Sequence, residues 1–233
     1  MDASAAPLHS LRMTDIPIRD AATIILLRQT SDGPMVLMGQ RGARAVFMPN
    51  MFVFPGGALD PADRANLSHS SELPEHVRER LCTHSDPELA VPLARAAIRE
   101  LFEETGQALG QPGQSAGDVP ADWQGFYDLG LAPHLAGLDF VFRAVTPAGR
   151  PRRFDARFFV ADAADLASDP DDFSSACDEL SHLHWVLLPE ARKLELPFIT
   201  EVVLAEIDAR VQGGPRPVPF FSHEGERSHF RML

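Results

Sequence analysis

The stretch "LARAAIRELFEETGQAL" (Leu93–Leu109) decides the fold and raises the first question about function. Its apolar residues recur with the period of an amphipathic α-helix. On a helical wheel with about 100° per residue, Glu103 and Glu104 lie within roughly 60° on either side of Glu100. The opposite side of the wheel carries Ile98, Leu101, Phe102 and Thr105. The pattern therefore predicts a helix with one carboxylate face and one core face.

The residues that flank this stretch predict where the helix begins and ends. Asp86 is a good N-cap for a helix whose first residue is Pro87, although Pro92 offers a second starting point. Gly106 is suited to end the helix, because glycine adopts left-handed backbone conformations without steric cost.

The three clustered carboxylates have two explanations. They repel one another by a few tenths of a kcal/mol per pair, and their place near the helix C-terminus opposes the helix dipole. A solvated acidic surface with Arg95 and Arg99 as partners is one explanation. A site for a hard divalent cation is the other, because Mg²⁺ prefers oxygen ligands. The upstream "FPGG" (Phe54–Gly57) favours the cation site, because glycine lets the main chain approach a ligand closely.

The rest of the chain shows strand and helix patterns without strict alternation. Two apolar runs separated by "SDG" predict a β-hairpin, and a polar segment after "FPGG" predicts an insertion with one short helix. We expect a loose terminus first and a mobile surface loop over residues 107–124. The predicted strands span 21–29, 34–41, 51–54, 138–147, 152–164 and 180–188, and the further helices span 75–82, 189–196 and 197–213.

Composition limits the class of partner. A net charge of -12 argues against a nucleic-acid partner, because nucleic-acid binders usually present a basic face. No apolar run approaches the roughly 20 residues of a membrane span. The start of the chain shows no secretion-signal pattern, and Cys82 and Cys177 form no disulfide framework. We therefore expect a cytoplasmic protein with a small-molecule partner and no membrane contact; whether it forms a homodimer is left open.

The segment "RELFEETG" (Arg99–Gly106) resembles the second half of the Nudix hydrolase signature, G-x5-E-x7-R-E-U-x-E-E-x-G-U, where U is a bulky apolar residue. Gln107 departs from it, since an apolar residue is usual there. The first half is interrupted: Asp63, not Glu, follows Gly57 at the expected interval, and an insertion then precedes Arg99. Two further segments, "FMPNMFVFPGG" and "ELSHLHWVLLPEA", are similar to sequence motifs of the subgroup related to peroxisomal coenzyme A diphosphatases.

The resemblance implies an α/β fold, a Nudix-type α/β/α sandwich around a mixed β-sheet. It implies a flexible N-terminus over residues 1–19 and a single Nudix domain over residues 20–233. The insertion, at about residues 61–90, lies inside the signature.

By the same resemblance, Mg²⁺ or Mn²⁺ is held by Glu100, Glu103, Glu104 and the carbonyl of Gly56. Arg99 orients the carboxylates without touching the metal. The catalytic residues implied are Glu103, Glu104 and Arg99.

Two assignments stay open at this point. The acidic residue of the first half of the signature is Asp63 or, in its place, Glu88. The proton acceptor is Glu103 or Glu104, or one of two residues that precede a predicted strand, Asp178 and Glu179.

The resemblance also implies residues that bind the substrate, namely Arg41, Arg44, Phe54 and Glu179. Arg41 keeps the coenzyme A subgroup's spacing to Phe54. Val46 and Asn50 stand where that subgroup has Arg and Gly.

Several other residues have a structural and a functional interpretation. His182 and His184 share one face of a predicted strand, and exposed histidines are favoured over a metal pair. Core packing is favoured over substrate stacking for Phe154, Phe158 and Phe159. Arg152 and Arg153 either reach a second phosphate or face water.

The activity implied is metal-dependent hydrolysis of a diphosphate linkage in a nucleoside diphosphate derivative. Coenzyme A or acyl-coenzyme A is the leading substrate, with ADP-ribose, dinucleotides and nucleotide sugars as alternatives. A non-catalytic Nudix-fold regulator and an isomerase of the isopentenyl diphosphate type are less favoured, because all three carboxylates are present and no suitable cysteine motif is found.

Overall fold

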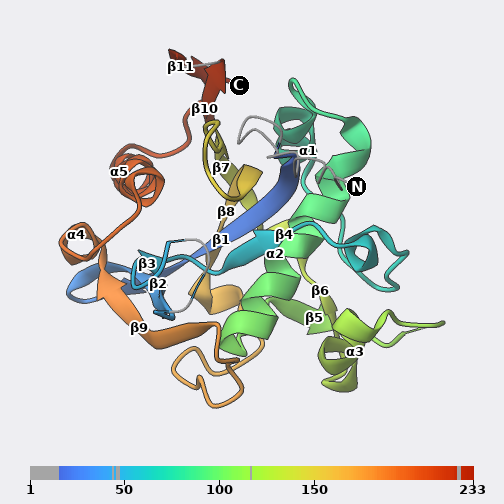
Figure 1. Cartoon of the computed structure of the whole chain (residues 1–233). Coiled ribbons are helices and arrows are strands. Elements are labelled where there is room, and N and C mark those ends of the chain that lie inside the picture. The colour runs from blue at the N-terminus through green and yellow to red at the C-terminus, as the bar shows by residue number, and fades with distance from the viewer. Residues whose placement is uncertain (1–15, 44, 46–47, 116, 225–226) are drawn as a thin grey trace, which may run out of the picture.

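The computed structural model describes residues 16–43, 45, 48–115, 117–224 and 227–233. Its main feature is one mixed β-sheet, in which the strands follow the order β11-β10-β7-β8-β1-β2-β3 (Figure 1). Two further strands join beside this path, since β4 pairs with β1 and β9 pairs with β2. The strands are β1 (Ile18–Thr30), β2 (Gly33–Arg41), β3 (Phe52–Val53), β4 (Gly56–Ala58), β7 (Asp139–Val145), β8 (Arg153–Asp162), β9 (Leu180–Leu187), β10 (Pro219–Glu224) and β11 (Arg227–Met232).

Strand β1 forms the centre of the sheet because it is apolar on both faces. It runs parallel to β8 and antiparallel to β2 and β4. Ile24, Ile25 and Leu26 are fully buried, so consecutive side chains of this strand fill the cores on opposite sides of the sheet. The strand begins at Ile18, three residues before the predicted start, and residues 1–15 of the predicted flexible terminus lie outside the described residues.

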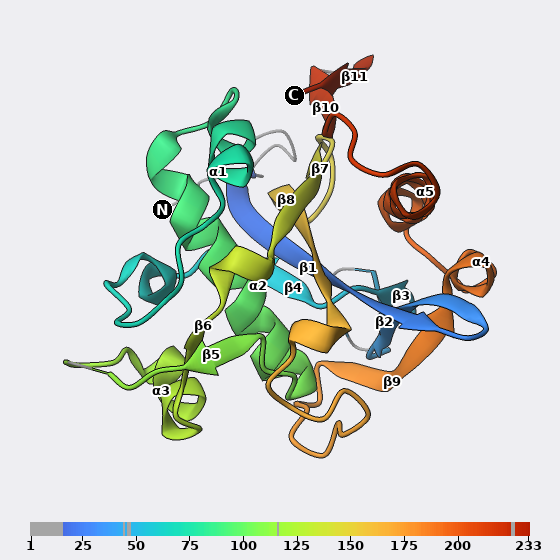
Figure 2. The ribbon, with the colours of Figure 1, turned by 180° about the vertical axis from the view of Figure 1, so that it is seen from behind.

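Helices cover both faces of the sheet, as Figures 1 and 2 show from opposite sides. Helices α1 (Glu75–Cys82), α2 (Ala90–Thr105) and α3 (Ala121–Asp128) lie on one side, and α4 (Leu188–Ala191) and α5 (Phe198–Gly213) lie on the other. Each side has its own cluster of buried apolar residues. The predicted α/β/α sandwich around a mixed sheet is therefore confirmed.

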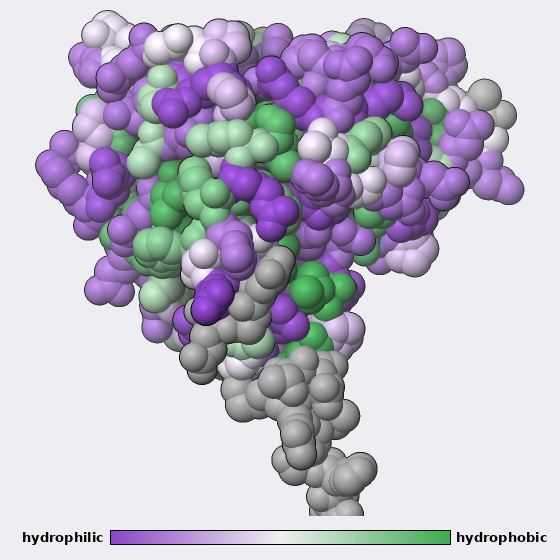
Figure 3. Space-filling view, turned by 90° about the horizontal axis from the view of Figure 1, so that it is seen from above, coloured by the Kyte–Doolittle hydropathy of each residue, from purple (hydrophilic) through white to green (hydrophobic). Residues whose placement is uncertain are grey.

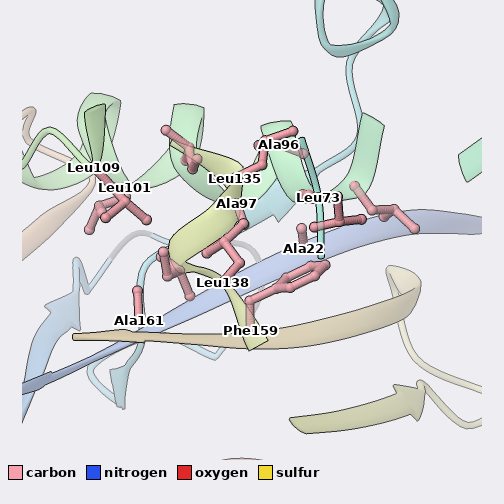
Figure 4. Packing of buried hydrophobic residues seen from close by; sticks show 14 of the residues in the cluster. Ala22, Leu73, Ala96, Ala97, Leu101, Leu109, Leu135, Leu138, Phe159 and Ala161 are labelled. Carbon is pink, nitrogen blue, oxygen red and sulfur yellow. The ribbon is translucent and has the colours of Figure 1, made fainter. Parts of the chain in front are cut away.

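Helix α2 packs closely on the sheet because its inner face is built largely from alanine. Ala94, Ala96 and Ala97 are fully buried, and such short side chains let the helix backbone approach the strands. Figure 4 shows residues of this helix and of the sheet in one packed cluster, among them Ala96, Ala97 and Leu101 with Ala22, Phe159 and Ala161.

Both predicted helix ends are found. Asp86 accepts a hydrogen bond from the backbone N–H of Glu88 at 2.9 Å and so caps a short 3-10 helix, Pro87–Leu89, which leads into α2. Gly106 ends α2 with a φ of 74°, a left-handed conformation that glycine adopts without strain. Pro92 lies in the first turn of α2, where its missing N–H costs no helical hydrogen bond.

The prediction of a mobile loop over residues 107–124 is wrong in part. The segment contains β5 (Gly110–Pro112), which pairs with β6 (Leu131–Pro133), and the start of α3. Trp123 and Phe126 of α3 are buried in the core beside α2. Eight residues with three aromatic anchors are too short to show a helical period, so the Gly- and Pro-rich composition before them dominated the prediction.

The insertion in the signature packs on the core. It holds a 3-10 helix, Pro61–Arg64, and α1, whose bounds match the predicted helix. Its own Leu67, Leu73, Val77 and Leu81 are buried in the core cluster on this side of the sheet.

A C-terminal β-hairpin, which the sequence did not indicate, extends the sheet. Strand β10 pairs in parallel with β7 and antiparallel with β11. Histidine and arginine interrupt the apolar alternation in "PFFSHE" and "RSHFRM", which hides the strand pattern. Figure 3 views the molecule from this end and shows apolar patches within a mainly hydrophilic surface. Within the described residues, no helix has both the length and the apolar character needed to cross a bilayer.

The buried position of Trp123 predicts that α3 contributes to stability. Trp123→Ala should lower the free energy of unfolding by about 3–5 kcal/mol, because it removes a large aromatic side chain from a closed core. Leu129→Ala, next to the same helix but 59% exposed, is the control and should change it by less than about 0.5 kcal/mol. Urea denaturation followed by circular dichroism measures both, and equal losses would contradict the packing of α3.

Candidate active site

The candidate site is organised by a buried ion pair between Arg99 of α2 and Asp63 of the insertion. The Arg99 Nε and Nη2 atoms donate to the two carboxylate oxygens of Asp63 at 2.9 Å and 3.0 Å. Asp63 is fully buried, and its Oδ2 also accepts from the backbone N–H of Asp60, which fixes the 3-10 turn. Of the two candidates for the acidic residue in the first half of the signature, Asp63 is therefore the one that contacts Arg99. Glu88 does not, since it lies exposed at the start of the helix.

Arg99 directs its remaining donors at the other carboxylates of the signature. Its Nη1 donates to Glu100 at 2.9 Å and to Glu103 at 2.8 Å, and Nη2 also donates to the carbonyl of Ala58 at 3.1 Å. Burial lowers the pKa of Arg99, but the hydrogen bonds and charges of Asp63, Glu100 and Glu103 raise it by more. The guanidinium is therefore permanently charged and holds Glu100 and Glu103 through these hydrogen bonds.

Arg95, the second expected partner, contacts no signature carboxylate. Its Nη1 donates to the backbone carbonyls of Asp63 and Ala65. It therefore helps to hold the insertion against α2, and Arg99 is left as the one arginine of α2 that contacts the glutamates.

The glutamates carry more negative charge than this arginine neutralises. Burial raises the pKa of Glu100 to about 7, an effect that Arg99 only partly offsets. Burial and the neighbouring Glu100 raise the pKa of Glu104 well above its ordinary value, and its hydrogen bond from the Gly56 N–H, at 2.9 Å, lowers it only in part. Burial also raises the pKa of the half-exposed Glu103. Ionised carboxylates here need a further positive charge.

The glycines of "FPGG" let the main chain reach these carboxylates. Gly56 pairs with Thr23 of β1, which holds the loop beside α2. A Cβ added to Gly57 would lie 2.3 Å from Oε1 of Glu100, so any larger residue would displace that carboxylate. A close approach of backbone and carboxylate oxygens suits a hard cation.

The arrangement is not a complete metal site as it stands. In the described part of the chain, no group of three or more His, Cys, Asp or Glu side chains is placed to hold an ion. Glu100 and Glu103 both accept hydrogen bonds from Arg99. Glu104 accepts from the Gly56 N–H, and Glu100 lies against Gly57, so these two carboxylates are the ones beside the glycine backbone. Two carboxylates and a backbone carbonyl are nevertheless an oxygen donor set that fits Mg²⁺ or Mn²⁺.

A cavity of about 890 Å³ begins at this carboxylate cluster. Arg41, Phe54 and Glu179, three of the residues predicted to bind substrate, line it together with Glu100. Arg41 and Glu179 form an ion pair of 2.8 Å at its rim. The fourth predicted residue, Arg44, lies outside the described residues, as does Val46.

The phenylalanines of β8 and the histidines of β9 each had a structural and a functional interpretation, and their burial distinguishes between the two. Phe159 is fully buried in the core on the α2 side, and Phe158 is buried in the core cluster of the opposite face, so core packing is confirmed for both. Phe154 is only partly buried, and it lines the cavity together with Phe158. His182 and His184 are exposed on β9, in agreement with the prediction of exposed histidines.

Gln107, the departure from the signature, is fully buried and has a structural role. Its side-chain nitrogen donates to the carbonyls of Asp169 and Asp172 at 3.1 Å and 2.8 Å, and its oxygen accepts from Ser168. No sequence pattern indicated these contacts, because the partners are two backbone carbonyls and one serine hydroxyl on a loop that is distant in the sequence.

A mixed sheet between helical layers, with a glycine-rich loop beside a glutamate-bearing helix, defines a Nudix-type fold. No protein-family model matches the chain. A Caenorhabditis elegans protein that carries the name nudix hydrolase 7 is 31% identical over 182 residues, which cover 72% of this chain and 51% of that protein. Acyl-coenzyme A diphosphatase NUDT19 of Gallus gallus is 26% identical over 236 residues, covering 74% of this chain and 62% of that protein.

A solved Nudix hydrolase from Alicyclobacillus acidocaldarius has the same fold, with a TM-score of 0.60, 26% identity and coverage of 82% of this chain and 91% of that one. The chain belongs to the Nudix hydrolase family. It spans about half the length of the Caenorhabditis elegans relative, 51%.

The Arg99–Asp63 pair should contribute far more to stability than a surface pair. Asp63→Ala leaves a buried guanidinium without its main partner and should lower the free energy of unfolding by about 3–5 kcal/mol. Glu190→Ala, which breaks the exposed Lys193–Glu190 pair, is the control and should cost less than about 1 kcal/mol. Denaturant titration measures both, and a loss for Asp63→Ala no larger than the control's would contradict this role of Asp63.

Proposed function

We propose that the chain hydrolyses a diphosphate linkage of a nucleoside diphosphate derivative with the aid of Mg²⁺ or Mn²⁺. The observation that carries the proposal is the buried, incompletely neutralised carboxylate cluster at one end of a large cavity. Glu100, Glu104 and the Gly56 carbonyl would hold the cation. Bound there, it would neutralise the charge of the diphosphate and stabilise the leaving phosphate.

The chain's own residues would position the reaction. Arg99 holds Glu100 and Glu103 in fixed orientations, and Asp63 in turn holds Arg99. Gly57 leaves the space that the Glu100 carboxylate occupies. The substrate would enter along the cavity past Arg41 and Phe54.

Glu179 is the proton acceptor that the geometry favours. Of the candidates Glu103, Glu104, Asp178 and Glu179, it alone is among the described residues that line the cavity. Its charge also contributes to the raised pKa values of Glu100 and Glu104, which places it near the carboxylate cluster. A carboxylate in this position can accept the proton of an attacking water.

Coenzyme A or acyl-coenzyme A is the proposed substrate. The likeness to the acyl-coenzyme A diphosphatase of Gallus gallus supports it, at 26% identity. The cavity, at about 890 Å³, falls within the size range of small-molecule sites. ADP-ribose, dinucleotides and nucleotide sugars share the same diphosphate linkage and are the alternatives.

Hydrolysis is tested with purified protein, Mg²⁺ and a panel of coenzyme A, acyl-coenzyme A, ADP-ribose, NADH and diadenosine polyphosphates, with products identified by mass spectrometry. We expect turnover of at least one member and the fastest turnover for a coenzyme A species. Glu179→Gln should lower kcat by about 100-fold or more, because it removes the proton acceptor. Asp178→Asn, its neighbour outside the cavity, is the matched control and should keep kcat. Failure to hydrolyse any member would refute the proposed activity.

Cation binding is tested without turnover by thermal unfolding in the presence of Mn²⁺. At a concentration of 100 times its Kd, Mn²⁺ should stabilise the protein by about 2.7 kcal/mol. Gly57→Ala should lose most of this gain, because the added Cβ displaces the Glu100 carboxylate. Gly213→Ala, with no atom within 4 Å of the added Cβ, is the control and should keep it. Equal stabilisation of all three proteins would place the cation elsewhere.

A further inference from the structure

The floor of the cavity is a row of alanines that crosses four strands of the sheet. Ala21 of β1 pairs with Ala58 of β4 and with Ala156 of β8, and Ala156 pairs with Ala144 of β7. All four line the cavity. A methyl group projects little from a strand, so four in register hollow out this face of the sheet where larger side chains would fill it. Phe221 of β10, paired with Ala144, extends the row.

The cavity also extends along β1, on both sides of the alanine row, and its two ends in this direction differ in charge. At one end, Thr23 pairs with Gly56 and lies beside the carboxylate cluster. At the other end, Arg19 pairs with Phe154 of β8. Arg19, Ala21 and Thr23 alternate along β1 and all line the cavity. With a rise of roughly 3.3 Å per residue, the Arg19 position is about 13 Å from the Thr23 position.

Arg150 and Arg152 join Arg19 at this far end. They lie on the turn between β7 and β8, and all three arginines are exposed and line the cavity. Within the described residues, none of the three forms an ion pair with a carboxylate, whereas Arg99, Arg143 and Arg157 all do. Three unneutralised guanidinium groups at one cavity end stand out in a chain with a net charge of -12.

The C-terminal hairpin completes this end. His223 and Ser228 face each other across the hairpin and line the cavity. The surroundings there are positive: after burial, the charges of Arg153 and His229 lower the pKa of His223. An anionic group placed there would meet guanidinium and hydroxyl donors with no competing carboxylate among the residues that line this end.

We infer that the far end of the cavity is a second anion subsite, which binds a phosphate monoester of the substrate separate from the linkage that is cleaved. Guanidinium groups bind phosphate oxygens through paired, charge-assisted hydrogen bonds. The aromatic rings of Phe154 and Phe221 lie beside the alanine floor, where a nucleobase or other planar group can stack. The inference rests on the proposed function for the linkage cleaved. It specifies that function further, because the enzyme then prefers nucleotides with an additional phosphate group.

The subsite is tested first by binding alone, in EDTA and without hydrolysis. Calorimetric titration compares adenosine 3′,5′-bisphosphate with AMP, which lacks the second phosphate. The wild-type protein should bind the bisphosphate roughly tenfold or more tightly than AMP. The double variant Arg150→Gln/Arg152→Gln should bind the two nucleotides equally. Arg150→Lys/Arg152→Lys keeps the charges and should keep part of the preference.

The matched control is Arg78→Gln. Arg78 is an exposed arginine on α1, on the opposite side of the sheet, so its loss changes the net charge without touching the cavity. It should leave the preference unchanged. Equal binding of the two nucleotides by the wild-type protein, binding of neither, or equal loss of preference in the control would overturn the subsite.

Hydrolysis provides a second readout. The ratio of kcat/KM for coenzyme A to that for dephospho-coenzyme A should fall towards one in the Arg150→Gln/Arg152→Gln variant, while dephospho-coenzyme A is still turned over. An unchanged ratio would contradict the subsite. If neither compound is hydrolysed by the wild-type protein, the proposed activity fails, and the binding comparison still decides whether the subsite exists.

Discussion

The buried contact between Arg99 and Asp63 is the constraint on which the rest of the site depends. Two residues far apart in the sequence meet in the core, and each satisfies the other's hydrogen-bonding groups. A buried guanidinium or carboxylate alone is very costly, so neither the insertion nor the helix can leave this arrangement independently. The same guanidinium reaches Glu100, Glu103 and the Ala58 carbonyl. One side chain therefore sets the position of the helix, the insertion and the residue that follows the "FPGG" glycines relative to one another.

This arrangement creates a charge imbalance that has a functional consequence. The helix places Glu100 and Glu104 against the backbone of Gly56 and Gly57, where burial raises their pKa values, and the single arginine does not offset the effect. Gly57 brings the backbone against one of them. Burial of these carboxylates is costly when no positive charge offsets it, and this cost supports the proposal that a cation and the phosphates of a substrate bind beside them. The cavity that starts at this cluster provides the space for such a substrate.

Much of the architecture could be predicted from the sequence, because it is encoded locally. The bounds of α2 were predicted closely from its helical period, from Asp86 as the capping residue and from Gly106 as the terminating residue. Helix α1 was predicted with its observed bounds. Features that depend on distant contacts were less accessible. Helix α3 is short and its stability comes from burial of Trp123, and the C-terminal hairpin forms only because β7 offers an edge to pair with. The alanine floor depends on the register of four strands, which no single segment of the sequence reveals.

In the site, too, locally encoded features could be predicted, and features that depend on distant contacts could not. Asp63 and Glu88 could not be distinguished from the sequence, because an insertion separates them from Arg99 and only the fold decides which of them reaches it. We propose that Glu100, Glu104 and the Gly56 carbonyl together hold a divalent cation. The most direct measurement is anomalous X-ray scattering at the manganese edge from crystals grown with Mn²⁺. We expect a peak between these three groups; a fully occupied Mn²⁺ peak elsewhere, with none at this position, would rule out the site.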